Sequence, residues 1–286
     1  MNIDLMALKK NGFMRQVQND NLSLRLKAVG GNFTAAQIAA IAEISEKYGE
    51  GRVHITSRQG VEIPFIKLAD VEAVKAELET RGLNTCNCGP RVRSVTACQG
   101  NKICSFGCID TYPLAATFSD RYIGRELPTK MKIGVTGCRN NCLKVEGNDF
   151  GIKGGYAVEW IPDACTLCGL CAKACRQGAI TQTDSAILLE ESKCNNCGRC
   201  VKSCPVDAWK GEPGYLLFFG GVFGNLVAIG EQFLPIIREK EAVFRVADAA
   251  LDFFDRYGKP GERFRGTIER MGWKKFKAEM QAACYR

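Results

Sequence analysis

Eight of the sixteen cysteines fall into two copies of one spacing pattern, and the two copies begin 29 residues apart. Each copy has the form C-x2-C-x2-C-x3-C, and together they comprise Cys165, Cys168, Cys171, Cys175, Cys194, Cys197, Cys200 and Cys204. The short spacers allow several thiolates to point at one centre, and soft sulfur ligands suit iron–sulfur clusters. A structural zinc ribbon would need two separated pairs of ligands for each metal, which two runs of four cysteines fit poorly. We therefore expect iron–sulfur clusters here.

The duplicated spacing resembles that of the bacterial two-cluster ferredoxins, in which the last cysteine of each run serves the other cluster. The resemblance implies a first 4Fe–4S cluster held by Cys165, Cys168, Cys171 and Cys204. It implies a second 4Fe–4S cluster held by Cys194, Cys197, Cys200 and Cys175. We expect this ferredoxin module to occupy residues 158–210, inserted into a larger domain.

Four further cysteines form a different constellation, with Cys98 and Cys104 separated by five residues and Cys138 and Cys142 by three. Their loops, residues 96–104 and 137–142, resemble the two cluster loops of the siroheme-dependent sulfite and nitrite reductases. The resemblance implies a third 4Fe–4S cluster on these four cysteines, with the Cys142 sulfur bridging that cluster to siroheme iron. It also places Thr96 and Asn140 beside the cofactor. Arg139 stands where that family commonly has proline.

Basic residues match the same family's anion-binding segments. Residues 56–59 resemble its T-x-R-Q segment, residues 127–132 resemble its L-P-x-K-x-K segment, and an arginine precedes the first cysteine loop. The resemblance implies that the substrate is bound by Arg58, Arg93, Lys130 and Lys132. It implies that the cofactor is contacted by Thr56, Gln59, Gly220 and Gly221, and we expect surplus arginines such as Arg52 and Arg91 to pair with siroheme carboxylates.

The physical chemistry of sulfite agrees with this interpretation. Sulfite is a small anion, and converging arginine and lysine side chains would hold its oxygens by charge-assisted hydrogen bonds. Two lysines at i and i+2 on a strand face the same side, so Lys130 and Lys132 can reach one site. They could also donate protons, provided that nearby cations depress their pKa.

These residues must be positioned by strands and helices that the sequence also indicates. Residues 21–28, 52–57 and 61–66 alternate like strands, a capping box at Thr34 and Gln37 begins one helix, and Asp70 is expected to cap a second that stops at Gly82. The β-α-β-β-α order predicts an α+β sandwich over residues 1–82, with helices on one face of an antiparallel sheet. The family resemblance implies that this is the family's ferredoxin-like half-repeat. A loop-rich siroheme and 4Fe–4S domain is expected at 83–157 and 211–286, with a helical tail from Asn225 onward.

The bulk composition bounds the remaining possibilities. Hydrophobic content of 46% and charged content of 24% are globular values. No signal peptide is recognised, and the most apolar stretch, residues 215–230, is too short and glycine-rich for the roughly 20 apolar residues of a membrane span. We therefore expect a cytoplasmic protein whose cysteines are ligands rather than disulfides. The formal charge of +8 permits nucleic-acid binding, but no supporting motif accompanies it.

Taken together, these features predict six-electron reduction of sulfite to sulfide, with electrons relayed from the ferredoxin clusters through the siroheme-coupled cluster. A siroheme nitrite reductase, an electron-transfer subunit and a siroheme-binding sensor are the alternatives. Retention of Lys132, where the nitrite branch tends to have asparagine, favours sulfite. No flavin or nicotinamide motif is present, so we expect an electron-donor protein or subunit.

Larger family members contain two tandem copies of the reductase fold, whereas this chain carries one. We therefore expect a homodimer in which the basic residues of one protomer face the cofactor held by Cys142 of the other. A site built within one chain and an obligate partner chain are the alternatives. Cys86, Cys88, Cys108 and Cys284 are left unassigned, and buried thiols are their commonest explanation.

Overall fold

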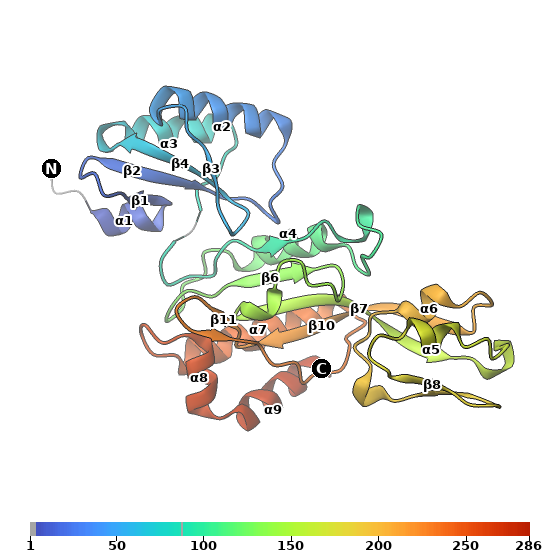
Figure 1. The fold of residues 1–286 in the computed structure, drawn as a ribbon. Coiled ribbons are helices and arrows are strands. Elements are labelled where there is room, and N and C mark those ends of the chain that lie inside the picture. The colour runs from blue at the N-terminus through green and yellow to red at the C-terminus, as the bar shows by residue number, and fades with distance from the viewer. Residues whose placement is uncertain (1–3, 87) are drawn as a thin grey trace.

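The computed structural model describes residues 4–86 and 88–286, arranged as three regions along the chain (Figure 1). The N-terminal region contains a sheet of order β1-β2-β4-β3, in which every neighbouring pair is antiparallel. Its elements are α1 (Leu5–Lys10), β1 (Phe13–Arg15), β2 (Asn21–Leu26), α2 (Ala35–Tyr48), β3 (His54–Ile55), β4 (Val61–Lys67) and α3 (Val71–Thr80). The predicted α+β class is confirmed, and β2, α2, β3, β4 and α3 follow the predicted order. Helix α1 and strand β1 were not predicted, and the strand expected over 52–57 is reduced to the two residues of β3.

The two long helices of this region begin differently. The predicted capping box opens α2, because the Gln37 backbone N–H donates to Thr34 Oγ1 at 3.1 Å and the Thr34 N–H donates to Gln37 Oε1 at 3.0 Å. The expected cap at Asp70 is wrong in detail, since Asp70 occupies the N-cap position of α3 without a capping side-chain hydrogen bond. A 3-10 turn, Leu68–Asp70, leads into α3 instead.

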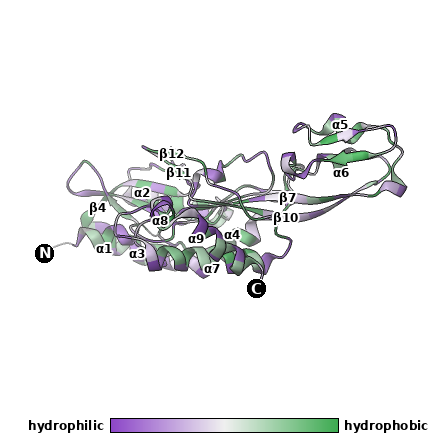
Figure 2. Ribbon diagram, turned by 90° about the horizontal axis from the view of Figure 1, so that it is seen from below, coloured by the Kyte–Doolittle hydropathy of each residue, from purple (hydrophilic) through white to green (hydrophobic). Residues whose placement is uncertain are grey.

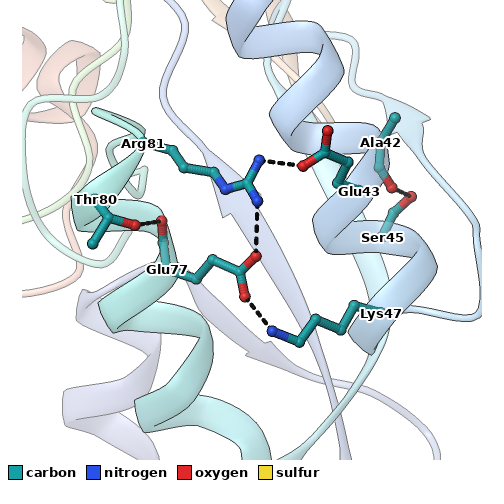
Figure 3. A network of polar contacts seen from close by, with 7 residues as sticks. All are labelled: Ala42, Glu43, Ser45, Lys47, Glu77, Thr80 and Arg81. Carbon is teal, nitrogen blue, oxygen red and sulfur yellow. Dashed lines mark hydrogen bonds and ion pairs between the residues drawn. The ribbon is translucent and has the colours of Figure 1, made fainter.

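Apolar side chains fix both helices on the sheet. Ile41 and Ile44 of α2 and Val74 of α3 are almost fully buried against Leu24 and Ile63 of the strands. Burial of a side chain of this size stabilises the fold by about 1.5–3 kcal/mol. On the surface, Lys47 and Arg81 bond Glu77 at 2.8 and 3.3 Å, and Arg81 also pairs with Glu43 (Figure 3). Such exposed pairs contribute little, so packing determines this arrangement.

The central region is built on a second sheet, of order β10-β7-β6-β5. Strands β5, β6 and β7 run parallel, and β10 is antiparallel to β7. The elements are β5 (Thr96–Ala97), α4 (Thr111–Tyr122), β6 (Ile133–Thr136), β7 (Phe150–Trp160), β10 (Trp209–Phe219), β11 (Val222–Phe223), β12 (Val227–Ala228), α7 (Lys240–Tyr257), α8 (Phe264–Met271) and α9 (Trp273–Cys284). Helices α4 and α7 to α9 share one apolar core with this sheet.

One sequence expectation for this region is incomplete and another is wrong. Residues 83–156 are rich in loops as expected, but they also contain the 12-residue helix α4 and most of the 11-residue strand β7. The tail is helical only from Lys240, because residues 222–228 form the β11–β12 hairpin and Glu231 and Ile237 bridge to β10. A glycine-rich segment can form a strand when it pairs with a strand from a distant part of the chain. The hydrophobic periodicity of the segment itself does not reveal that partner.

A cysteine-rich lobe, residues 161–208, connects the ends of β7 and β10 and projects from the central sheet (Figures 1 and 2). It contains α5 (Leu170–Ala174), β8 (Ile180–Gln182), β9 (Ile187–Leu189) and α6 (Arg199–Ser203). Cys171, Cys200 and Trp209 help to form its small core. Among the residues that the structure describes, no helix is both long and apolar enough to cross a membrane.

Candidate functional site

The four predicted substrate-binding residues line one cavity. This cavity, of about 250 Å³, lies between the N-terminal region and the central sheet. We call it the cationic pocket, and its lining includes Arg58, Arg93, Lys130 and Lys132 together with Arg25, Thr56, Cys86, Cys88 and Ser94. Segments far apart in the sequence thus bring several cations to one small volume, as an anion site requires.

Two hydrogen bonds hold Arg58 in the pocket. Its Nη2 donates to the Ser94 carbonyl at 2.6 Å, and its Nη1 donates to Asn148 Oδ1 at 3.1 Å. Burial lowers the pKa of Arg58 to about 10, so the guanidinium remains charged at neutral pH. The pocket therefore contains a fixed positive charge whose direction is set before any ligand arrives.

Lys130 and Lys132 reach the same pocket although β6 begins only at Ile133. Burial first, and then the charges of Arg58 and Arg263, lower the pKa of Lys132. Asp149 holds the backbone here, because its Oδ2 accepts from the Lys132 N–H at 2.8 Å. Asp149 is itself fully buried and receives two hydrogen bonds from Arg263 Nη2, at 2.8 and 2.9 Å.

The turn that carries Arg58 is attached to strand β5. Gln59, in the left-handed region at φ 62°, exchanges two hydrogen bonds of 2.9 Å with the backbone of Ala97. Thr56 Oγ1 accepts from the Gly60 N–H at 3.1 Å and closes the turn. Thr56 and Gln59 thus position Arg58 in this structure, and their predicted contact with a cofactor stays a prediction.

Other residues predicted to contact the cofactor have partners within the chain. Arg91 pairs with Glu126 at 2.8 Å, and the exposed Arg52 lies 5.8 Å from the Phe65 ring. Gly220 adopts φ 75°. A side chain at Gly221 would collide with the Glu146 carbonyl, 2.0 Å from the added carbon. The left-handed backbone at Gly220 and the close backbone packing at Gly221 thus account for the glycine pair, and its predicted contact with a cofactor stays a prediction.

The second cysteine set gathers at the opposite end of β5 and β6. Burial raises the pKa of Cys138, and charge repulsion from Cys104, Cys98 and Cys142 adds to that increase, so these four thiols are neighbours. The Gly137 N–H donates to Cys98 Sγ at 3.0 Å, and the exposed Asn140 hydrogen-bonds Cys138 through its backbone. Cys142 is exposed, so its sulfur can face a ligand outside this chain's core.

The lobe contains two small cavities with four cysteines in each. One is lined by Cys175, Cys194, Cys197 and Cys200. The other is lined by Cys165, Cys168, Cys171 and Cys204. In each cavity the fourth cysteine of one run joins the first three of the other, which is the exchange that the two-cluster spacing implies.

No group of three or more histidine, cysteine, aspartate or glutamate side chains within residues 4–86 and 88–286 is placed to hold a single metal ion. A cubane differs from a mononuclear site, because each of its four thiolates binds a different iron and the sulfurs lie further apart. Cysteine-only donor sets suit such clusters.

The cationic pocket and the second cysteine set lie at opposite ends of the same parallel strands. Arg93 precedes β5 and Lys132 precedes β6, whereas Cys98 and Cys138 follow these strands. Because Thr96 pairs with Gly134 in the parallel register, the N-terminal ends of β5 and β6 lie side by side. At about 3.3 Å per residue, the five steps from Arg93 to Cys98 span about 16 Å.

Several supporting residues escaped the sequence analysis. Asn148, Asp149 and Arg263 orient the cations of the pocket, and neither their spacing nor a motif sets them apart. The unassigned cysteines Cys88, Cys108 and Cys284 are buried. Cys86 and Cys88 line the cationic pocket, with Cys86 Sγ 3.3 Å from Ser94 Oγ.

Sequence comparisons match both regions to one family. Residues 14–81 match the nitrite/sulfite reductase ferredoxin-like half domain, and residues 88–285 match the nitrite and sulphite reductase 4Fe-4S domain. A coenzyme F420-dependent sulfite reductase of Methanocaldococcus jannaschii is 33% identical over 88% of this chain, which spans 41% of that relative. One subunit of the anaerobic sulfite reductase of Salmonella typhimurium is 31% identical over 76% of this chain and 69% of that protein.

Solved structures agree on the fold. Dissimilatory sulfite reductase I superposes with a TM-score of 0.76 at 20% identity, covering 92% of this chain and 69% of that one. The NirA protein of Mycobacterium tuberculosis gives a TM-score of 0.69 at 18% identity, covering 99% of this chain and 47% of that one. With both family models matched in order along nearly the whole described sequence, this chain belongs to the nitrite and sulfite reductase family.

Proposed function

We propose that this chain is a siroheme-dependent sulfite reductase that converts sulfite to sulfide. The observation that carries the proposal is the convergence of Arg58, Arg93, Lys130 and Lys132 on one cavity of suitable size for a small oxyanion. Relatives named as sulfite reductases match 76–88% of the chain, whereas a ferredoxin–nitrite reductase of Leptolyngbya laminosa matches 50% of it.

The residues present suit siroheme and the clusters that the family uses. Siroheme carries eight carboxylates, and the cations of the pocket, with Arg52 and Arg91 nearby in sequence, are chemically suited to pair with them. The exposed Cys142 would supply the sulfur ligand, beside a 4Fe–4S cluster on Cys98, Cys104, Cys138 and Cys142. When bound, siroheme would supply the redox-active iron at which sulfite is reduced.

The protein's own contribution to the reaction is binding and proton supply. Arg58 is held in a fixed direction by Asn148 and Ser94, so it can bind an oxyanion without first being ordered. Lys132 is better able to release a proton than an exposed lysine, because burial and neighbouring cations lower its pKa. The pocket would thus hold the anion and donate protons as its oxygens leave as water.

We infer that the lobe is a two-cluster ferredoxin module, giving the chain three 4Fe–4S clusters in all. The two four-cysteine cavities support this inference, since each combines the cysteines that the exchanged pattern requires. A module of this kind needs an electron-donor protein or subunit. The lobe projects from the central sheet (Figure 2), so such a donor could approach it.

We further infer that two copies of the chain form composite sites. The cationic pocket and Cys142 lie at opposite ends of β5 and β6. A two-fold pair would place the same patch of each copy on its partner, so that the pocket of one chain could face the cysteine end of the other. Both ends of β5 and β6 in each chain would then contribute to a site.

The optical spectrum of anaerobically purified, cofactor-loaded protein tests the function. Siroheme bands that shift on addition of sulfite, with sulfide formed on reduction and a smaller response to nitrite, are expected. Broad iron–sulfur absorbance without tetrapyrrole bands, in protein whose clusters are fully loaded, would reduce the chain to an electron carrier. Nitrite turnover that exceeds sulfite turnover would assign it to the nitrite branch.

A further inference from the structure

Arg139 has an unusual environment for a guanidinium group. It follows Cys138 in the second cysteine set, where it is half-buried and lies 5.8 Å from the Phe218 ring. Its Nη1 is buried and has no hydrogen-bond partner among the described residues. Buried polar groups are almost always hydrogen-bonded in folded proteins, so this N–H indicates an acceptor that the polypeptide does not supply.

The charges around Arg139 are also unbalanced. Lys153, buried in β7, forms an ion pair with Glu146 and lies 4.6 Å from the same Phe218 ring. Within residues 4–86 and 88–286, Arg139 itself takes part in no ion pair, and Glu146 is the carboxylate that acts on both cations. The buried Lys153 and the half-buried Arg139 therefore share one carboxylate. Burying an unpaired charge is costly, so a further anion is expected close by.

The cysteine-rich lobe supplies the candidate for that anion. The loop between Cys194 and Cys197 docks on β7, because the Tyr156 N–H donates to the Asn196 carbonyl at 2.8 Å and Asn196 Nδ2 donates to the Tyr156 carbonyl at 3.1 Å. Cys194 and Cys197 are the thiols whose charges act on Arg139. Both line the lobe cavity that also contains Cys175 and Cys200.

We propose that Arg139 and the positive charge it shares with Lys153 raise the reduction potential of the cluster bound by Cys175, Cys194, Cys197 and Cys200. This proposal rests on the proposed function, since it requires the lobe to hold its clusters. Arg139 acts through its charge at the junction between the lobe and the second cysteine set, and it does not contact the substrate.

The direction of the effect follows from charge. A 4Fe–4S cluster with four thiolates is net negative, and reduction adds one more negative charge. A buried cation stabilises the more negative state, and an N–H directed at a cluster sulfur acts in the same sense, because cluster potentials depend on hydrogen bonds to sulfur and on net charge. The other lobe cavity has none of its cysteines among the charges that act on Arg139, so its cluster serves as an internal reference.

The test is a potentiometric titration of the fully loaded, anaerobic protein followed by EPR, in wild type and in Arg139→Gln. We expect one lobe couple to move to lower potential while the other stays in place. Lys202→Gln is the matched control. Lys202 is an exposed cation at the same junction, with its Nζ donating to the Ser105 carbonyl at 3.1 Å, so solvent should screen its charge and keep the shift smaller.

Two results would overturn the proposal. One is unchanged lobe potentials in Arg139→Gln, and the other is an equal shift of both lobe couples, which would indicate a general disturbance of the lobe. If Arg139→Gln fails to load its clusters, Arg139→Lys provides the test. The potential of the affected lobe couple is then expected between the wild-type value and the value for a neutral side chain. A potential above the wild-type value would contradict the proposal. A chain that holds all three clusters yet does not reduce sulfite would contradict the proposed function while leaving this measurement valid.

Discussion

The two ends of the parallel strands β5 and β6 differ in how they are held. At the end that precedes the strands, charged side chains are held by partners from distant segments: Asn148 Oδ1 and the Ser94 carbonyl orient Arg58, and Asp149 binds both Arg263 and the Lys132 backbone. At the end that follows the strands, Cys98 and Cys138 accept hydrogen bonds from the backbone N–H groups of Gly137 and Asn140, and Cys142 is exposed.

We infer that the proposed anion site is built before any cofactor is present, whereas the cysteine end would depend on its proposed cluster for final order. Metal-site binding energy is then partly folding energy at that end. Removal of the clusters should disturb the cysteine loops more than the cationic pocket. The predictions below separate the two ends by changing one at a time.

The largest effect is expected from Cys142→Ser at the cysteine end. Loss of the proposed bridging sulfur should abolish sulfite reduction and alter the siroheme spectrum, because a hydroxyl is a poor ligand where a soft thiolate is needed. Optical spectra and sulfide assays would measure both. Cys284→Ser, which changes a thiol buried in the central core, is the control, and full activity in Cys142→Ser would refute the assignment.

At the cationic end, Arg58→Ala should reduce kcat/KM for sulfite by about 10²-fold, the loss typical for one preorganised donor to an oxyanion. Arg58→Lys keeps the charge but cannot bond Asn148 and Ser94 simultaneously in the same geometry, so an intermediate loss is expected. Steady-state kinetics would report both variants. A normal kcat/KM in Arg58→Ala, with cofactors loaded, would remove Arg58 from the site.

The pH dependence of turnover probes Lys132. Its pKa is lowered by burial and by Arg58 and Arg263, so as pH rises the ammonium is lost earlier than from an exposed lysine, and kcat/KM should fall on the alkaline side. Lys132→Arg keeps the charge to higher pH but donates protons poorly. The alkaline limb should therefore move to higher pH while kcat decreases. If the alkaline limb of Lys132→Arg stays at the wild-type pH, another group causes the fall in turnover.

The smallest effect on activity is expected from a change at the start of α2 in the N-terminal region. Thr34→Ala removes the N-cap of α2, whose side chain accepts from the Gln37 N–H at 3.1 Å, and should lower the free energy of unfolding by about 1 kcal/mol. Denaturant titration would show the change, and sulfite kinetics should stay at the wild-type level. A large loss of activity in Thr34→Ala would mean that the N-terminal region is coupled to the site more tightly than its contacts indicate.

The N-terminal region was predicted well, because the start of α2 and the alternation along its strands depend on residues that are close together in the sequence. The capping box at Thr34 and the order of the elements are examples. The central region was harder to predict, since β7 and β10 stabilise each other although 48 residues, 161–208, lie between them in the sequence, and α4 begins without a side-chain cap.

The site divides in the same way. Spaced cysteines and basic segments could be found from the sequence, and the structure brings the basic ones into one pocket. Asn148, Asp149 and Arg263 could not be found, because their roles depend on contacts between segments up to 114 residues apart. Their chemistry is ordinary, and only the fold places them beside the cations.

The proposed division of labour between the two ends can be tested by mixing two inactive chains. Arg93→Ala disables the cationic pocket and Cys142→Ser disables the cysteine end. If a site combines one end from each of two chains, random two-fold pairing of equal amounts should restore about a quarter of wild-type sulfite reduction. If each chain builds its own site, the mixture should stay inactive although mixed dimers form, and that result would contradict the composite site.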